Sequence, residues 1–197
     1  MKTRKNIRGF SLIELMIVVA LITLFLVAAV PSIRLYLEST KVRNVAESIE
    51  RGLQRTKFYA VKNNVPVEFV LNTAAQSWTI WQLDTTATPA KQTLLLETFV
   101  WGDGTRGHGW TAVSAGVIPA TALDDGQARV TFGKGSGWLL RKNLSAATVP
   151  PKNITVTSAM EGTRRLQVDV LMTGGVRVCD RDLPEDDYKS CRYTALL

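Results

Sequence analysis

The side chains that carry most enzymatic chemistry are scarce in this chain. Its 197 residues include one histidine, His108, and two cysteines, Cys179 and Cys191. General acid–base and nucleophilic catalysis need a positioned base beside an activated nucleophile, and no such constellation can be named here. The sequence therefore predicts a protein that is not an enzyme, with no metal site and no cofactor.

The most unusual carboxylate is Glu14, because it lies inside an apolar run. Residues Phe10 to Val30 are otherwise apolar, apart from the small polar Ser11 and Thr23. About 21 residues at about 1.5 Å each make a helix long enough to cross a bilayer core. A carboxylate at that depth is costly in lipid and usually has a functional partner. An ordinary membrane anchor would not need it.

Basic residues precede the apolar run, which sets its expected orientation. They are Lys2, Arg4, Lys5 and Arg8. Positive flanks stay in the cytoplasm, so everything after Pro31 is expected to face outward. A secretory signal peptide fits poorly, since its apolar region is shorter and ends at a small-residue cleavage site. Subtracting these four charges from the net +7 leaves +3, so the basic excess mostly sets topology.

The heptapeptide GFSLIEL at residues 9–15 resembles the class III signal of type IV prepilins and type II secretion pseudopilins. The resemblance implies that a membrane prepilin peptidase cuts after Gly9 and that the new N-terminal Phe10 is N-methylated. It also implies that Glu14 pairs with the N-terminus of a neighbouring subunit during assembly. An amine and a carboxylate in a medium of low dielectric constant compensate each other, and neither is tolerable alone.

A helical pattern continues beyond the apolar run. Apolar residues recur at three- and four-residue spacing at Ile33, Leu37, Val42, Val45, Ile49 and Leu53, with charged residues between them. The spacing predicts one helix from about Phe10 to about Lys62, roughly 80 Å long. Pro31 removes a backbone donor and is expected to kink this helix. Gly52 is a mild weak point.

Short β patterns separated by turn residues follow. The expected strands are Val65–Leu71, Trp78–Leu83, Gln92–Trp101, Ala128–Phe132, Asn153–Ser158, Arg164–Leu171 and Val176–Cys179. The turns are NTAAQS, Gly133–Gly137 and Glu161-Gly162. A G-x-G-x-x-G match at residues 102–107 lacks a βαβ context, so it and the adjacent His108 are expected in a loop. The fold class is therefore α+β, with a long N-terminal helix packed on antiparallel sheets.

Both ends of this second region resemble FimT/GspH-type minor pilins and pseudopilins. The matching stretches are SIERGLQRTKFYAVKNNVPVEFVL (Ser48–Leu71), VTFGKGSG, ITVTS and RRLQVDVLMTGGVRVCD. Residues 84–127 match only by position. The resemblance implies a cleaved leader (1–9), a transmembrane and assembly helix (10–30), an amphipathic helix (31–64) and a periplasmic β-rich head (65–197).

The function implied is that of a structural minor pilin at or near a pilus tip, where it helps to start assembly. Its partners would be other minor and major pilins, the prepilin peptidase and the inner membrane. It would first be a single-pass inner-membrane protein with its head in the periplasm. The alternative is a GspH-like pseudopilin of type II secretion, although the C-terminal cysteine loop resembles pilus minor pilins more.

The two cysteines lie in the part that is expected to be outside the cytoplasm. In an oxidising compartment Cys179 and Cys191 are expected to form a disulfide. A metal site has less support, because the chain has one histidine and no CxxC motif. The five tryptophans alternate with polar residues and are expected mostly to pack in the core or on strands.

A DNA-binding role is a hypothesis of a different class. Some FimT-like pilins bind DNA through a G-R-x-R element, and here Gly174 and Arg177 match while Gly175 replaces the first arginine. The number of phosphate contacts governs affinity, so that loss matters, although Arg181 and Arg192 could compensate. Nearby carboxylates oppose DNA and could instead hold calcium, but their spacing matches no known calcium loop: Asp180, Asp182, Glu185, Asp186 and Asp187. A solvated loop of mixed charge is favoured over both.

Overall fold

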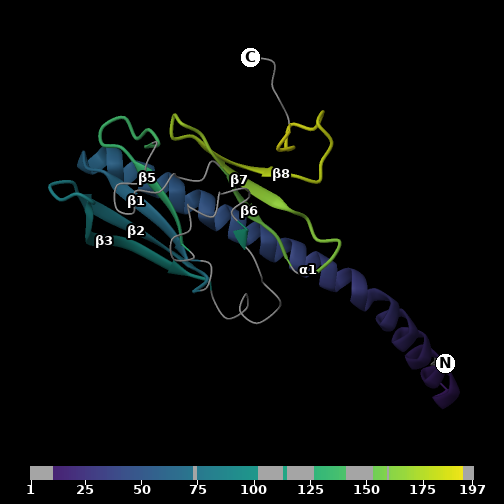
Figure 1. Ribbon diagram of the computed structural model, residues 1–197. Helices are drawn as coiled ribbons and strands as arrows, with labels where there is room; N and C mark the ends of the chain where they lie inside the picture. The colour runs from purple at the N-terminus through teal and green to yellow at the C-terminus, as the bar shows by residue number, and fades with distance from the viewer. Residues whose placement is uncertain are drawn as a thin grey trace, which may run out of the picture. The chain divides into compact units, whose positions relative to one another are not determined.

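The computed structural model describes residues 11–72, 75–101, 113–114, 127–140, 153–158 and 160–192. Its elements are one long helix followed by strands, so the predicted α+β class is confirmed (Figure 1). The helix α1 spans Leu12–Asn63. The strands are β1 (Val67–Asn72), β2 (Ser77–Asp84), β3 (Lys91–Val100), β4 (Val113–Ser114), β5 (Gln127–Phe132), β6 (Asn153–Val156), β7 (Leu166–Val170) and β8 (Val176–Asp180).

The chain forms two compact units, Met1–Leu37 and Glu38–Leu197. In the first unit the apolar side chains of α1 are exposed from Leu12 onward. No single helix of the described residues is long and apolar enough to cross a membrane. By length and composition alone, the pair Leu12–Val27 and Ser32–Asn63, bent by 42° at the intervening break, could do so. Pro31 lies within this break.

In the second unit, which we call the head, the described residues form two four-stranded antiparallel sheets. Their strand orders are β3-β2-β1-β5 and β4-β6-β7-β8. Both sheets contribute to one buried cluster with α1: Phe69 and Val130 come from the first sheet, and Ile154 and Val168 from the second. The helix is therefore the element that joins the two sheets through a common core.

The amphipathic pattern of the helix is confirmed within the head. Val42, Ile49 and Leu53 are fully buried there. Ile33 and Leu37, which the same pattern includes, belong to the first unit and are exposed. Helical spacing identifies which side chains share a face, but burial depends on what packs against that face.

The first sheet packs closely against the helix at Gly52. A Cβ atom there would lie 2.7 Å from Cε2 of Phe69 and 3.1 Å from Cε2 of Trp78. The indole Nε1 of Trp78 also donates a hydrogen bond of 3.0 Å to Oγ of Ser48. The helix continues through this glycine because tertiary packing outweighs its low helix propensity.

The boundaries of the elements differ from the predicted ones by a few residues. The helix ends at Asn63, and Asn64 takes a left-handed conformation with φ of 53°, which is common just beyond a helix C-terminus. All seven predicted strands are present. The strand β4 was not predicted. The G-x-G-x-x-G stretch and His108 lie outside the described residues.

Tryptophan burial follows the prediction with one exception. Trp78 and Trp101 are buried, and Trp81 is half-buried with Nε1 bonded to Oγ1 of Thr79. Trp138, in contrast, is 60% exposed in the turn that follows β5. Trp110 lies outside the described residues.

Candidate functional site

The residues expected to act in assembly begin at the N-terminus. Gly9 and Phe10 lie outside the described residues. Glu14 lies in the first turn of α1, where a carboxylate interacts favourably with the helix dipole. Its neighbours Ile13 and Leu15 are 64% and 62% exposed. An acidic side chain thus stands in an apolar helix surface that no described part of the chain covers.

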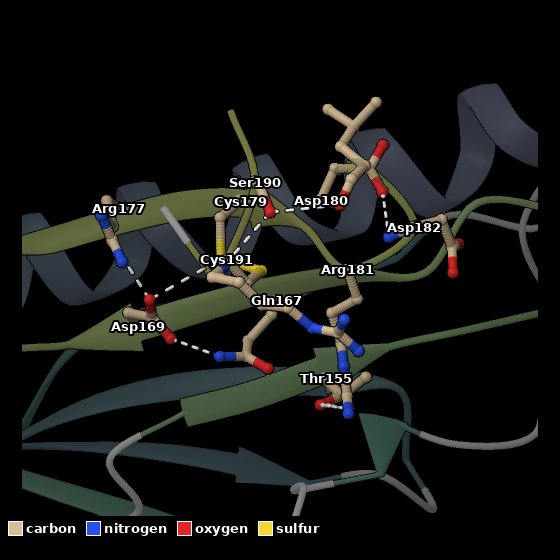
Figure 2. The surroundings of a disulfide bond; sticks show 12 residues. Thr155, Gln167, Asp169, Arg177, Cys179, Asp180, Arg181, Asp182, Ser190 and Cys191 are labelled. Atoms are coloured by element: carbon tan, nitrogen blue, oxygen red, sulfur yellow. Dashed lines mark hydrogen bonds and ion pairs between the residues drawn. A yellow bond between two sulfur atoms is a disulfide. The ribbon is translucent and has the colours of Figure 1, made fainter. Parts of the chain in front are cut away.

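The C-terminal candidate site is built around the predicted disulfide, which the structure contains. Cys179 on β8 is bonded to Cys191, with a Cα–Cα distance of 4.9 Å and a sequence separation of 12 (Figure 2). On the loop-entropy model, closing a loop of that size stabilises the fold by about 3 kcal/mol. The bond therefore holds the end of the described chain against the second sheet.

The disulfide loop also pairs with the outer edge of β8. The backbone N–H of Asp180 donates to the carbonyl of Lys189 at 2.8 Å, and the N–H of Cys191 donates to the carbonyl of Asp180 at 3.0 Å. These bonds form a parallel bridge between Asp180 and Ser190. An unpaired edge strand is a site for unwanted strand pairing, and the loop protects this end of it.

Three carboxylates of the predicted acidic cluster, Asp180, Asp182 and Glu185, are paired with arginines. Asp182 Oδ1 accepts hydrogen bonds from Nε and Nη2 of Arg165 at 2.8 and 2.5 Å. These bonds lower the pKa of Asp182, with a smaller contribution from the backbone N–H of the same arginine. Asp180 lies 3.8 Å from the guanidinium of Arg164. Among the residues that the structure describes, no group of three or more His, Cys, Asp or Glu could hold a metal ion.

The arginines proposed for DNA contact are in part already engaged. Nε of Arg177 donates to Oδ2 of Asp169 at 3.1 Å. Nη1 of Arg181 donates to Oγ1 of Thr155 at 3.3 Å. Figure 2 shows these two arginines on either side of the disulfide. Arg192, which directly follows Cys191, lies 3.9 Å from Glu185. Each of these arginines has a carboxylate or a hydroxyl as a neighbour, which reduces the charge and the number of N–H donors available to bind a phosphate.

Gly174, the first residue of the partial DNA-binding motif, has a structural explanation. Its φ is +75°, and a Cβ atom there would lie 2.1 Å from the carbonyl oxygen of Gly137. At Gly175 the nearest atom to an added Cβ is Cδ1 of Leu171, at 3.2 Å, so a side chain fits there after a small shift. The tight packing of two turns is therefore enough to explain the glycine at position 174. Of the two residues that match the DNA-binding motif, only Arg177 still supports a DNA-binding role.

For the DNA hypothesis we expect a negative result. Wild-type protein should not shift duplex DNA at tens of micromolar near physiological salt, because Asp169 offsets Arg177 and carboxylates crowd the same loop. Gel-shift titrations at two salt concentrations provide the measurement. Gly175→Arg restores the missing cation and Arg177→Ala removes the remaining one. Salt-sensitive binding by wild type that Arg177→Ala abolishes would instead establish the DNA-binding role.

A shallow cleft that sequence patterns did not reveal lies beside this loop. Its volume is about 500 Å³, and residues of the β6–β7 connection line it together with Arg165 and Asp182. Ser158 in its wall donates a 3.4 Å hydrogen bond to Oε2 of Glu38 on α1. The guanidinium of Arg164 is mostly exposed at its rim. The lining of the cleft comes from the β6–β7 connection and from Asp182 after β8, which the pairing of β7 with β8 brings together, so periodicity along the sequence could not have predicted it.

Comparisons with known proteins match both regions of the chain. Residues 4–30 match the Prokaryotic N-terminal methylation motif, and residues 45–174 match the family described as Type II transport protein GspH. No curated protein matches the chain. Among solved structures, the type IV minor pilin FimU from Pseudomonas aeruginosa strain PAO1 is 14% identical. That match covers 77% of this chain and 95% of the other, with a TM-score of 0.47.

Proposed function

The chain belongs to the Type II transport protein GspH family, and from that membership we propose that it is a minor pilin of a type IV pilus. It is incorporated at or near the pilus tip and helps to prime assembly. The observation that carries the proposal is the combination, in one chain, of an N-terminal methylation motif over residues 4–30 with a GspH match over residues 45–174. The family and its fold are those of structural proteins, which agrees with the lack of a catalytic constellation in the sequence.

In this proposal the first residues act in a fixed order. The prepilin peptidase cuts after Gly9, and the amine of Phe10 is methylated. The methylation motif indicates an N-terminal membrane anchor. Before assembly, the protein therefore resides in the inner membrane with its head in the periplasm. Glu14 then pairs with the N-terminal amine of a neighbouring subunit inside the helix bundle. The exposed apolar surface of α1 around Glu14 supports this role, because that surface needs lipid or other helices to cover it.

The alternative within the same family is a pseudopilin of the type II secretion system. The assembly chemistry of Gly9, Phe10 and Glu14 is the same in both systems. We prefer the pilus because the disulfide loop after β8 resembles that of pilus minor pilins. A strain with the pilus machinery but without the secretion machinery distinguishes the two. Recovery of the chain in sheared pili from that strain supports the pilus, and its absence there favours the secretion system.

Glu14→Ala is expected to lower incorporation into sheared pili about tenfold or more, because the partner amine is left unpaired in a medium of low dielectric constant. Insertion into the membrane should be unchanged or improved, since a carboxylate is removed from the apolar segment. Immunoblots of sheared and membrane fractions give both quantities. Glu161→Ala, in the exposed turn between β6 and β7, is the matched control. Normal amounts of the Glu14 variant in sheared pili would contradict the assigned role.

A further inference from the structure

An exposed apolar surface gathers at the C-terminal end of α1. Three segments form it: the last turns of the helix, the turn after β5 and the turn between β7 and β8, which lie close together (Figure 1). We call it the helix-end patch, and its apolar members are Phe58 (58% exposed), Val61 (45%), Trp138 (60%), Leu171 (50%) and Met172 (46%). A contiguous group of large apolar side chains on a protein surface often marks an interaction site.

Close packing of two glycines joins these segments into one platform. A Cβ atom on Gly137 would lie 2.8 Å from Cγ2 of Val61, and one on Gly174 would overlap the carbonyl oxygen of Gly137. The N–H of Leu139 donates to the carbonyl of Met172 at 3.1 Å. These contacts hold the backbone of the helix end and of the two turns in place. Binding through the exposed side chains therefore loses little backbone conformational entropy.

The charges of the patch all have one sign. Residues 57–64, 133–140 and 171–175 include Lys57, Lys62 and Lys134 but no aspartate or glutamate. Nζ of Lys62 lies 5.7 Å from the ring centroid of Phe58, so this cation stands directly beside the apolar side chains. Asp169, which precedes the β7–β8 turn, is paired with Arg177, and most other carboxylates of the C-terminal region lie in the disulfide loop. The patch is thus an apolar centre with a basic rim.

We propose that the helix-end patch is the docking surface for the head of another pilin-type subunit, one that presents apolar side chains with carboxylates around them. The inference rests on the proposed function, since it assumes that the chain works in an assembly of such subunits. A fully buried apolar centre with a polar rim is the anatomy of protein interfaces, in which Trp, Phe and Met are enriched. A basic rim selects and steers a partner of opposite charge.

Position along the helix also supports a subunit as the occupant. The N-terminal end of α1 carries Glu14 and the exposed apolar segment, so it can supply contacts between helices. The head needs a separate surface if it is to contact a neighbouring head, and the helix-end patch has the composition for it. A nucleic acid would also be attracted by lysines and an exposed tryptophan. However, the patch has no arginine, and its apolar members outnumber its cations.

Photocrosslinking in intact cells tests the proposal with the full chain. The photoreactive residue p-benzoylphenylalanine replaces Trp138 or, separately, Met172, and Leu94 on β3 serves as an equally exposed apolar control position. We expect adducts at Trp138 and Met172 about tenfold more abundant than at Leu94, a difference equal to about 1.4 kcal/mol of preference. Mass spectrometry must identify the captured protein as one that itself has an N-terminal methylation motif.

Charge reversal tests the rim. Lys62→Glu combined with Lys134→Glu should reduce those adducts about tenfold. Lys91→Glu combined with Lys189→Glu changes the net charge equally at exposed positions elsewhere and should not. Unfolding midpoints of both double variants show whether the head remains folded. Adducts that do not respond to reversal, or that contain no pilin-type protein, overturn the proposal.

The docking surface and the pilus assignment are tested by different outcomes. If the chain is recovered in sheared pili but the helix-end patch gives no pilin-type adduct, the docking surface is wrong and the proposed function stands. If adducts form but the chain is missing from pili, the docking surface stands and the pilus assignment is wrong. If duplex DNA binds wild type and the Lys62→Glu, Lys134→Glu variant loses that binding while no adduct forms, the patch is a nucleic-acid site instead.

Discussion

Replacement of Gly9 by valine is expected to leave the basic leader attached to nearly all of the protein. The prepilin peptidase of the family that this motif resembles cuts next to glycine, and a branched side chain there should block it. Intact-mass spectrometry of membrane-extracted protein distinguishes the two forms. Cleaved protein should fall at least about tenfold, which corresponds to about 1.4 kcal/mol or more of lost transition-state stabilisation.

The control for this prediction stays within the leader. Ile7→Val keeps the four basic residues and the glycine, so it should be processed normally. Wild-type protein whose mature chain begins anywhere other than Phe10 would refute the assignment of the cleavage site. So would normal processing of the Gly9→Val variant.

Cleavage after Gly9 and the pairing of Glu14 involve two different amines in the proposed assembly. Glu14 pairs with the N-terminal amine of a neighbouring subunit, whereas cleavage frees the amine of this chain's own Phe10. An uncleaved chain also keeps four positive charges at the cytoplasmic surface. Because Gly9→Val should by itself keep the chain out of pili, Glu14→Ala should reduce incorporation little further in that background.

The second large effect concerns Gly174. Gly174→Val should lower the free energy of unfolding of the head by about 3 kcal/mol or more, because it combines a left-handed backbone with a steric clash. The backbone φ is +75°, and the new Cβ would overlap the carbonyl oxygen of Gly137. Urea unfolding of the full chain in detergent, followed by tryptophan fluorescence, provides the measurement.

Gly175→Ala is the neighbouring control. An added Cβ there meets only Cδ1 of Leu171 at 3.2 Å, and a side chain can yield by a few tenths of an ångström. We expect its effect to stay below about 1 kcal/mol. A Gly174→Val variant as stable as wild type would show that the two turns are not packed as described. It would also weaken the argument that the helix-end patch is held in place.

Local patterns in the sequence were enough to predict the N-terminal methylation motif and the order of the elements. The unusual position of Glu14, within an apolar run that follows basic residues, can be recognised from the sequence alone. A carboxylate in a membrane-spanning segment is costly wherever the rest of the chain lies. Helical spacing predicted α1, and alternation with turn residues predicted seven of the eight strands among the described residues. The cysteines were paired correctly because they are the only two, so no other connectivity exists.

The tertiary structure decided what single residues do within those elements. Gly52 has low helix propensity, yet it lets Phe69 and Trp78 pack against α1. Gly174 matched a DNA-binding motif, yet its contact is Gly137, far away in the sequence. Arg177 matched too, and Asp169 on the neighbouring strand offsets its charge. Each outcome depends on contacts between distant residues, and propensity or periodicity contains no information about such contacts because both describe only neighbours along the chain.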